Sequence, residues 1–458
     1  MAAELKIEQF EGLREILRFR RSPLTYVADM ARRGVDVRCI ATGRRRLFLV
    51  NQPDLIRDVL VAHDWNFIKG PGLRMSRATL LGDGLLTSEG ELHRRQRRLL
   101  QPGFNHDRLG QYAQDMVECA SRATDAWQDG EEYAINQEMA RLTLQIVTRC
   151  LFGMDIGADA EEVGAAMTEA LRVFHTLMSP FVQRFRALQK LVTGRAIRTR
   201  HRLDAVLQRI IRQHRDSSNQ FQDLLSMLMG ASDDANAYIS EVLLRDEAMT
   251  LFLAGHETTA NALTWTWYLL SQHPAVEEKM SEEVRRQLGD RMPAFEDVRR
   301  LAYTSQVLCE ALRLYPPAWM LARQALTDYR LGTVPVPAGA VIFMSPFATQ
   351  RDPRYWSDPE FFLPERWSDE VAAAVRPKFA FFPFGGGTRV CIGEHFAMME
   401  GVLVLATIAQ RWRLHLVPGQ NIEPWPRITL RPRHSIRFKV SKLTPAEASE
   451  PCEVKLGT

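Results

Sequence analysis

One short segment, FFPFGGGTRVCIG at residues 381–393, restricts the fold of this chain more than any other feature. Three consecutive glycines cost backbone entropy on folding, so they indicate a loop that another group approaches too closely for side chains. The apolar segment after Cys391 predicts a long helix to about Arg411. The sulfur therefore lies at or just before a helix N-terminus, where free N–H groups and the helix dipole favour a thiolate over a thiol.

A cysteine in such a loop can act as a metal ligand or as a nucleophile. A buried structural cysteine is the usual role of a lone Cys, but the three glycines before Cys391 make that a poor explanation. His395 lies four residues further on and could share a helix face with Cys391. A cysteine hydrolase built on Cys391 and His395 therefore stays open from this loop alone.

Composition narrows the class of protein. The chain has 458 residues, of which 46% are hydrophobic and 25% charged, as in ordinary globular proteins. A net charge of +4 is small for this length and argues against a protein that coats nucleic acid. The six cysteines form no CxxC pair and follow no secretory signal, so we predict neither a zinc cluster nor a disulfide framework. For the same reason we predict a cytoplasmic location.

Two segments test whether the chain is a membrane protein. The first 24 residues carry a charge every few positions and never reach the ~20 apolar residues of a membrane span, so we expect no anchor. Residues 251–270 have nearly the length of a span, but His256, Glu257 and Asn261 stand at the middle. A buried helix of a soluble protein is the better interpretation.

The pattern along the chain predicts a mainly α protein with a small β-rich part. Strand-like runs occur at residues 35–41 and 46–51, helical patterns dominate residues 52–315, and short strands return within 332–367 and 428–440. We find no repeats and no low-complexity linker before a polar tail. We therefore predict a single domain over residues 1–442 and a polar C-terminal tail over residues 443–458.

The cysteine loop resembles the haem-binding loop of the cytochrome P450 family, the haem-thiolate monooxygenases. Phe384, Gly387, Arg389, Cys391 and Gly393 match that loop at the right spacing. The resemblance implies a cytochrome P450 fold, one large haem-binding unit of the soluble bacterial type, holding haem b. Cys391 would be the axial iron ligand. Arg389 would face a haem propionate, and the glycines would let the loop lie against the porphyrin.

A second motif of the family lies in CEALRLYPP. Glu310 and Arg313 form an ExxR pair, and Arg366 in PERW would complete a Glu-Arg-Arg network behind the haem. Alone, such an i, i+3 pair is more often a solvated surface pair, and a helical wheel places both residues on the polar side. The resemblance gives them a structural role. Trp367 stands where the family usually has phenylalanine.

A third motif, LAGHETTAN, lies in the long helix. Gly255 costs about 1 kcal/mol relative to alanine and invites a kink. The hydroxyl of Thr258 can bond the carbonyl of Ala254, four residues earlier, and open a small groove. By resemblance Glu257 and Thr258 are the acid and alcohol that deliver protons to dioxygen there, although either residue singly would be read as ordinary helix surface.

A fourth segment, GELHRRQRRLLQPGF, is basic. His93 and Arg97 stand at i, i+4 and share one helix face. By resemblance they contact the haem propionates together with Arg323 and Arg389, although many members carry tryptophan in place of His93. The outward side chains, Arg94, Arg95 and Arg98, could be a solvated surface or could receive an acidic electron donor.

The resemblance implies insertion of one oxygen atom of O₂ into an apolar substrate that is fatty-acid-like, terpenoid or steroid-like. Electrons would come from a separate ferredoxin or flavodoxin and its NAD(P)H-dependent reductase, and we expect a monomer that binds no nucleic acid. Alternatives are an isomerase or dehydratase of the same fold that acts on peroxides without O₂, and a non-catalytic haem protein. The expected substrate walls, which also resemble any apolar core, are residues 72–86, 174–185 and 316–322.

Overall fold

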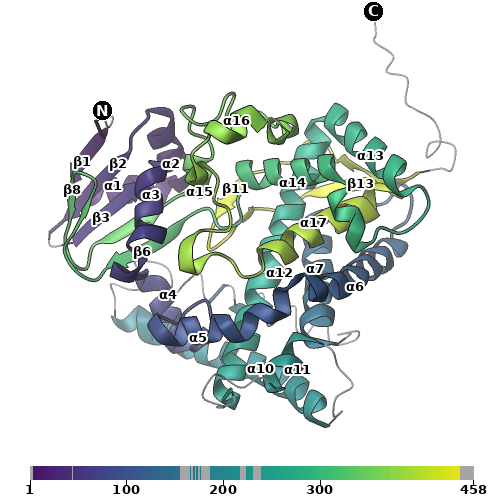
Figure 1. The fold of residues 1–458 in the computed structure, drawn as a ribbon, viewed down its shortest axis with the longest axis horizontal. Helices are drawn as coiled ribbons and strands as arrows, with labels where there is room; N and C mark the ends of the chain where they lie inside the picture. The colour runs from purple at the N-terminus through teal and green to yellow at the C-terminus, as the bar shows by residue number, and fades with distance from the viewer. Residues whose placement is uncertain are drawn as a thin grey trace, which may run out of the picture.

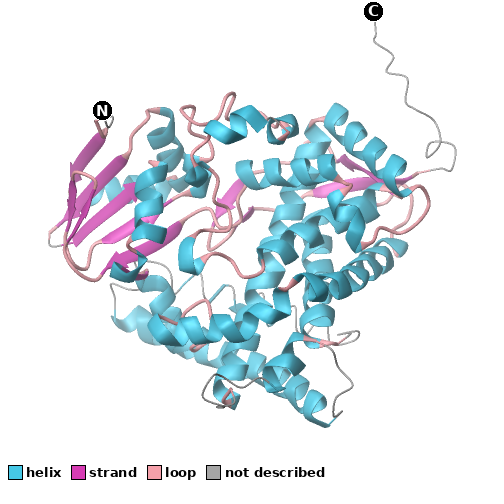
Figure 2. Cartoon of the chain, viewed as in Figure 1, coloured by secondary structure: helices cyan, strands magenta, loops and turns pink. Residues whose placement is uncertain are grey.

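The structure is a computed structural model of the chain. It describes residues 4–43, 45–154, 166, 169–170, 172–173, 176, 186–216, 223–230, 239–368 and 370–443. Helices form one large part of the molecule, and the largest sheet lies at one end of it, close to the N-terminus (Figures 1 and 2).

The largest sheet has six strands in the order β1-β2-β3-β9-β6-β4. It is mixed, because β1 pairs with β2 and β3 pairs with β9 in parallel while the other pairs are antiparallel. Its strands are β1 Ile7–Glu11, β2 Val37–Thr42, β3 Arg45–Val50, β4 Phe67–Lys69, β6 Leu321–Ala325 and β9 Val341–Met344. The smaller sheets contain β5 Glu132–Ala134, β7 Tyr329–Leu331, β8 Val334–Val336, β10 Trp412–Leu416, β11 Pro424–Pro426, β12 Leu430–Pro432 and β13 Arg437–Lys442.

The helices of the first half come between and after the early strands. They are α1 Leu13–Arg21, α2 Pro23–Arg32, α3 Pro53–Arg57, α4 Pro71–Ser76, α5 Gly90–Leu100, α6 His106–Asp125, α7 Ile135–Phe152 and α10 Arg186–Asp216. The later helices are α11 Leu224–Gly230, α12 Glu241–Gln272, α13 Pro274–Leu288, α14 Ala302–Leu314, α15 Pro346–Thr349, α16 Glu370–Val375 and α17 Glu394–Ala409.

Helix α12 runs through the main core. Ser240 caps it by accepting a hydrogen bond from the Leu243 N–H, and its buried face packs against α7, α14 and α17. Gly255 lets α7 approach closely, because a Cβ at this position would stand 2.9 Å from Cγ2 of Val147. The helix continues without a break through Gly255, so the glycine serves packing against α7.

These elements confirm the main sequence predictions. The fold is mainly α with small sheets, the segment 251–270 is a buried helix, and the early and late strands form where their patterns indicate. Within the described residues, no helix combines the length and the apolar character that crossing a bilayer requires. The last strand ends at Lys442, and residues 444–458 of the predicted tail lie outside the described residues, as does most of the proposed substrate wall at 174–185.

Candidate active site

The cysteine loop is held in place by its own backbone. The Cys391 N–H donates to the Phe384 carbonyl over 3.0 Å, and the Val390 N–H donates to Gly387 over 3.1 Å. Helix α17 begins three residues after Cys391, with Gly393 as its N-cap. The sulfur therefore stands just before a helix N-terminus, as predicted.

The glycines of this loop have different neighbours. Gly385 and Gly387 have positive φ angles of 77° and 69°, which favour glycine. A Cβ at Gly387 would lie 1.8 Å from the Leu60 carbonyl oxygen, and one at Gly386 would lie 2.4 Å from the Phe379 ring. Two of the three consecutive glycines are thus required by protein neighbours, and Gly387 is not among the residues that line the adjoining cavity.

A cavity of about 2480 Å³ adjoins the loop. Cys391 and Phe384 border it from the loop, and Ala254 and Thr258 border it from α12. The rest of its inner wall is mostly apolar, with the side chains of Leu73, Met75, Leu86, Leu251, Met320 and Leu321 among the lining. A cysteine and a helix-interior threonine therefore share one large apolar space.

Cys391 is exposed because its side chain borders this cavity, although protein groups surround the sulfur on its other sides. Burial raises its pKa, and the Gly393 N–H opposes that shift. A cation on the sulfur would lower the pKa again and stabilise the thiolate. His395 is exposed, is absent from the cavity wall and has no hydrogen bond to Cys391 within the described chain. A Cys391/His395 hydrolase has no support in this geometry.

Cationic side chains gather beside the cysteine loop. Lys69 at the end of β4 and Arg323 on β6 are buried and line the cavity, and their strands pair at these two residues. Arg389 also lines the cavity, donates to the Ser88 carbonyl over 2.6 Å and pairs with Glu89. Burial lowers the pKa of Arg323 to about 10, and neighbouring Arg389 acts in the same direction.

Helix α5 supplies the other two predicted contacts. Arg97 donates to the Val390 carbonyl over 2.7 Å, directly before Cys391. His93 is buried, and burial together with Arg389 and Lys69 lowers its pKa to about 3. This shift favours the neutral ring, which can offer a hydrogen bond to a haem propionate. Neither residue is part of the cavity wall itself.

Thr258 and Glu257 point to different surroundings. The Thr258 hydroxyl donates to the Ala254 carbonyl over 2.6 Å, as the spacing predicts. Glu257 is not in the cavity wall; its carboxylate accepts from the Thr429 hydroxyl over 2.9 Å and lies 3.8 Å from Arg431. Burial raises the pKa of Glu257, and Thr429 and Arg431 partly offset that rise. The sequence placed these two residues side by side, but the fold directs the carboxylate toward the segment around β12.

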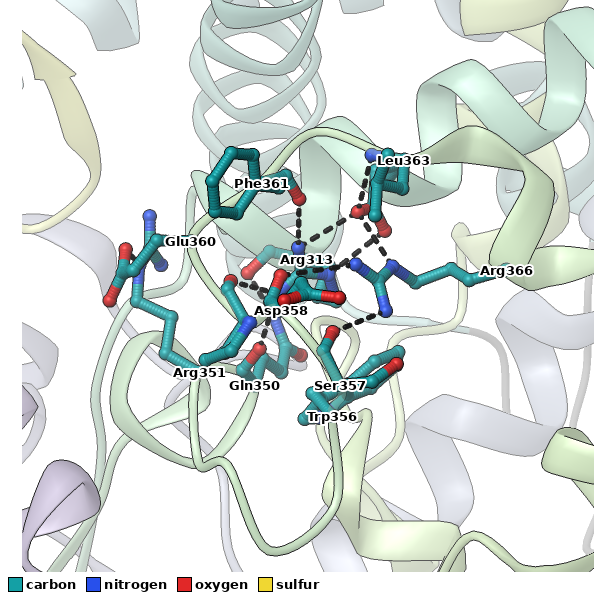
Figure 3. A network of polar contacts seen from close by, with 12 residues as sticks. Arg313, Gln350, Arg351, Trp356, Ser357, Asp358, Glu360, Phe361, Leu363 and Arg366 are labelled. Carbon is teal, nitrogen blue, oxygen red and sulfur yellow. Dashed lines mark hydrogen bonds and ion pairs between the residues drawn. The ribbon is translucent and has the colours of Figure 1, made fainter.

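The Glu310 network lies in the interior. Glu310 and Arg313 are both 0% exposed and form an ion pair of 2.8 Å, and Arg366 reaches the same carboxylate over 2.9 Å. Figure 3 shows Arg313 and Arg366 close to each other within this network, reached from different segments of the chain. The Trp367 indole N–H donates to the second carboxylate oxygen over 3.0 Å. The Glu-Arg-Arg network predicted by resemblance is confirmed, and the surface-pair alternative is wrong because α14 is covered by the loop of residues 350–367.

Comparison with known proteins decides the family. A protein-family model described as "Cytochrome P450" matches residues 13–440. The chain belongs to the cytochrome P450 family. It is 37% identical to cyclooctatin synthase of Streptomyces melanosporofaciens over 90% of this chain and 89% of that protein. It is 32% identical to pentalenene oxygenase of Streptomyces avermitilis over 93% of this chain and 94% of that protein.

A solved structure shows the same cytochrome P450 fold. A cyanobacterial member with bound retinoic acid, CYP120A1, superimposes with a TM-score of 0.84 and 26% identity, covering 96% of this chain and all of that one. Members of the family are haem-thiolate oxidoreductases that carry haem b on an axial cysteine. The chain is thus a monooxygenase of this family.

The residues beside the cavity of this P450 fit a haem. Haem carries two carboxylates, and the cavity wall offers the buried side chains of Arg323 and Lys69 together with Arg389, which is paired with Glu89. Burial, with Arg323 and Arg389, lowers the pKa of Lys69 well below its ordinary value, so a bound carboxylate would favour its charged form. Glu89 and Asp64 are the acids that act on the two arginines. Buried basic groups of this kind are stabilised by carboxylate counter-ions, and the haem propionates would supply them. The Cys391 sulfur faces the same cavity, where bound iron would stabilise the thiolate.

Sequence reasoning missed Lys69, Glu89 and Thr429 in this P450. Lys69 and Glu89 join the cation cluster, and the Lys69 backbone N–H bonds the Glu89 carboxylate over 2.6 Å. Thr429 holds Glu257 across 172 positions of sequence. None of the three stands in a local motif, so only their tertiary contacts reveal them.

Proposed function

We propose that this P450 inserts one oxygen atom of O₂ into an apolar, terpenoid-like substrate, with Cys391 as the axial ligand of the haem iron. The observation that carries the proposal is that Cys391 and Thr258 border one large cavity with mostly apolar walls. Relatives at 36% and 32% identity are named for the oxidation of cyclooctat-9-en-7-ol and pentalenene, both terpenoids, which supports this substrate class.

Different residues would hold the haem propionates, the ligand cysteine and the porphyrin ring. Arg323, Arg389 and Lys69 would pair with its propionates, while the neutral His93 would donate a hydrogen bond. Arg97 would act by fixing the Val390 carbonyl next to the ligand cysteine. Phe384, Ala254, Gly387 and Gly393 would shape the surroundings of the ring, Gly387 by letting the loop pack against Leu60.

When bound, the thiolate-ligated haem iron supplies activation of O₂, one atom of which enters the substrate while the other is reduced to water. The chain's own residues would supply the rest. Apolar walls exclude water and orient a C–H bond, and the Thr258 hydroxyl presents a proton donor in the cavity next to the Ala254 carbonyl. Glu257 would recharge that donor, and because Thr429 and Arg431 hold its carboxylate, it would have to leave them first.

Electrons would come from a separate acidic protein, a ferredoxin or flavodoxin. Arg97 ties α5 to the cysteine loop, and Arg94 and Arg98 of the same helix are exposed. Both lie near Glu91, Arg94 at 2.6 Å and Arg98 at 3.8 Å, so part of their charge is compensated. Salt should slow haem reduction by such a partner steeply, and Arg94→Glu/Arg98→Glu should slow it further, in stopped-flow mixing. The reversal Arg299→Glu/Lys439→Glu, which changes net charge equally, is the control.

The substrate class is tested by titration. Cyclic terpenes, fatty acids and sugars are added to the haem-loaded protein, and the low-spin to high-spin shift of the haem is followed. We expect saturable shifts with terpenes and none with sugars. Shifts with fatty acids alone would refute the terpenoid class while leaving the monooxygenase chemistry in place, and product that forms from a peroxide without NAD(P)H or O₂ would favour the isomerase.

A further inference from the structure

Helix α1 exposes apolar side chains on the outside of the protein. Leu13 is 68% exposed and Leu17 is 60% exposed, although neither belongs to a loop. Arg14 and Arg21 are exposed on the same short helix. Because residues advance by about 100° in a helix, Leu13, Leu17, Arg21 and Arg14 fall within one arc of about 100°. We call these four residues the α1 stripe.

The opposite face of α1 is the one that packs on the protein. Glu15 is buried and accepts a hydrogen bond from the Tyr26 hydroxyl over 3.0 Å. The rings of Phe19 and Tyr26 pack edge to face, with their centroids 5.7 Å apart. Ile16 also packs against the cluster that contains Tyr26. The helix is therefore seated by one face, and its exposed leucines are a property of the seated helix rather than of a loose segment.

The charge of the α1 stripe is positive. Arg14 and Arg21 form no ion pair with any residue that the structure describes. Arg18 beside them lies 3.9 Å from Glu15 and 6.0 Å from the centre of the Tyr26 ring. Arg45 at the start of β3 is exposed nearby on the cavity rim, and Glu11 is the exposed acid just before the helix. Exposed leucines among arginines are the pattern of a helix that lies on an anionic lipid surface.

The stripe lies at the rim of the cavity that contains Cys391. Leu13 and Arg21 of the stripe line this cavity, and so do Ile16 and Phe19 on the inner side of the helix. Figure 1 places α1 beside the large sheet at one end of the molecule, away from α10 and α13. A surface that covered the α1 stripe would therefore also meet the entrance to the cavity.

We propose that the α1 stripe docks this P450 onto an anionic lipid surface, so that an apolar substrate passes from the lipid into the cavity without crossing water. The docking stands on the stripe alone, whereas the delivery of substrate rests on the proposed function. Leu13 and Leu17 would enter the boundary between headgroups and acyl chains while the arginines meet lipid phosphates.

Docking is tested by sedimentation of the haem-loaded protein with phosphatidylcholine vesicles that contain 0% or about 30% phosphatidylglycerol. Each arginine near such a surface contributes about 1 kcal/mol, or roughly five-fold in binding, so Arg14→Gln/Arg21→Gln should weaken binding about 25-fold. Salt should weaken the wild-type protein in the same direction. Arg299→Gln/Lys439→Gln, with the same net charge, should bind like the wild type.

A second variant separates the apolar part from the charged part. Leu13→Ser/Leu17→Ser should lose binding while retaining the salt dependence of what remains, and its circular dichroism and haem content show whether it is folded. Equal losses in the α1 and control variants, or no binding to anionic vesicles, would overturn the proposal. So would sedimentation velocity showing a wild-type dimer that Leu13→Ser/Leu17→Ser dissociates, because a second copy would then cover the stripe.

The two proposals fail in different ways. If the stripe variants weaken vesicle binding but terpenes cause no spin shift of the haem, the docking proposal holds and the terpenoid substrate class is refuted. If terpenes shift the spin state of the haem in detergent-free buffer but the protein does not bind vesicles, the substrate class holds and the docking proposal is refuted. If both hold, terpene preloaded in anionic vesicles should reach the haem faster in the wild-type protein than in Arg14→Gln/Arg21→Gln.

Discussion

The indole of Trp367 makes a hydrogen bond that phenylalanine could not, and Trp367→Phe tests what that bond contributes. Glu310 is 0% exposed and receives five donors on two oxygens: two from Arg313, and one each from Arg366, the Leu363 N–H and the Trp367 N–H. The substitution removes one donor from a buried ionised carboxylate and retains a ring against Trp356.

A hydrogen bond to a charged group contributes about 1.5–3 kcal/mol. Trp367 is half-buried, so water can replace part of the lost bond, and we expect a loss near the lower end of that range. Glu310→Gln should cost more, about 3–5 kcal/mol, because it leaves Arg313, also 0% exposed, without its counter-ion. The free energies of unfolding are compared in urea by far-ultraviolet circular dichroism of the haem-loaded proteins.

The matched control is Trp425→Phe. Trp425 is also half-buried and has two arginines within cation–π range, Arg427 at 3.6 Å and Arg431 at 5.0 Å, but its indole makes no hydrogen bond to the described residues. Its loss should stay below about 1 kcal/mol. Equal losses in the two variants would refute the assignment of the Trp367 effect to its hydrogen bond with Glu310.

Three further outcomes are expected. Cys391→Ser should abolish the strongly red-shifted Soret band of the carbon monoxide complex, and an unchanged spectrum would contradict its role as ligand. Thr258→Ala should keep haem and substrate binding but divert NAD(P)H-derived electrons to hydrogen peroxide, because proton delivery in the cavity is disturbed. Glu257→Gln should slow the same proton delivery. An unchanged amount of product per NAD(P)H in both variants would refute the proton relay. Burial raises the pKa of Glu247 to about 8, so the folded protein keeps a proton that the unfolded chain loses above about pH 4.5, and stability should fall as pH rises to 8. Glu247→Gln should flatten that slope in urea titrations at several pH values, and an identical slope would refute the protonated state.

The sequence by itself determined the parts of this protein whose chemistry is local. The loop around Cys391, the start of α17, and the Thr258 hydroxyl on the Ala254 carbonyl all follow from residues within a few positions of one another. Short-range geometry in a loop or a helix is set by backbone conformation and spacing, which the sequence states directly. Order and spacing of such motifs were enough to predict the family.

Tertiary structure decided which groups meet across the chain. A helical wheel puts Glu310 on a polar side, yet the loop that carries Arg366 buries it, because the wheel records only the helix itself. Gly387 owes its glycine to the Leu60 carbonyl. Lys69 stands beside Arg323 because β4 pairs with β6, and Glu257 turns to Thr429 because β12 passes α12. Burial and long-range pairing depend on how distant segments pack, and no local pattern of residues encodes that packing by itself.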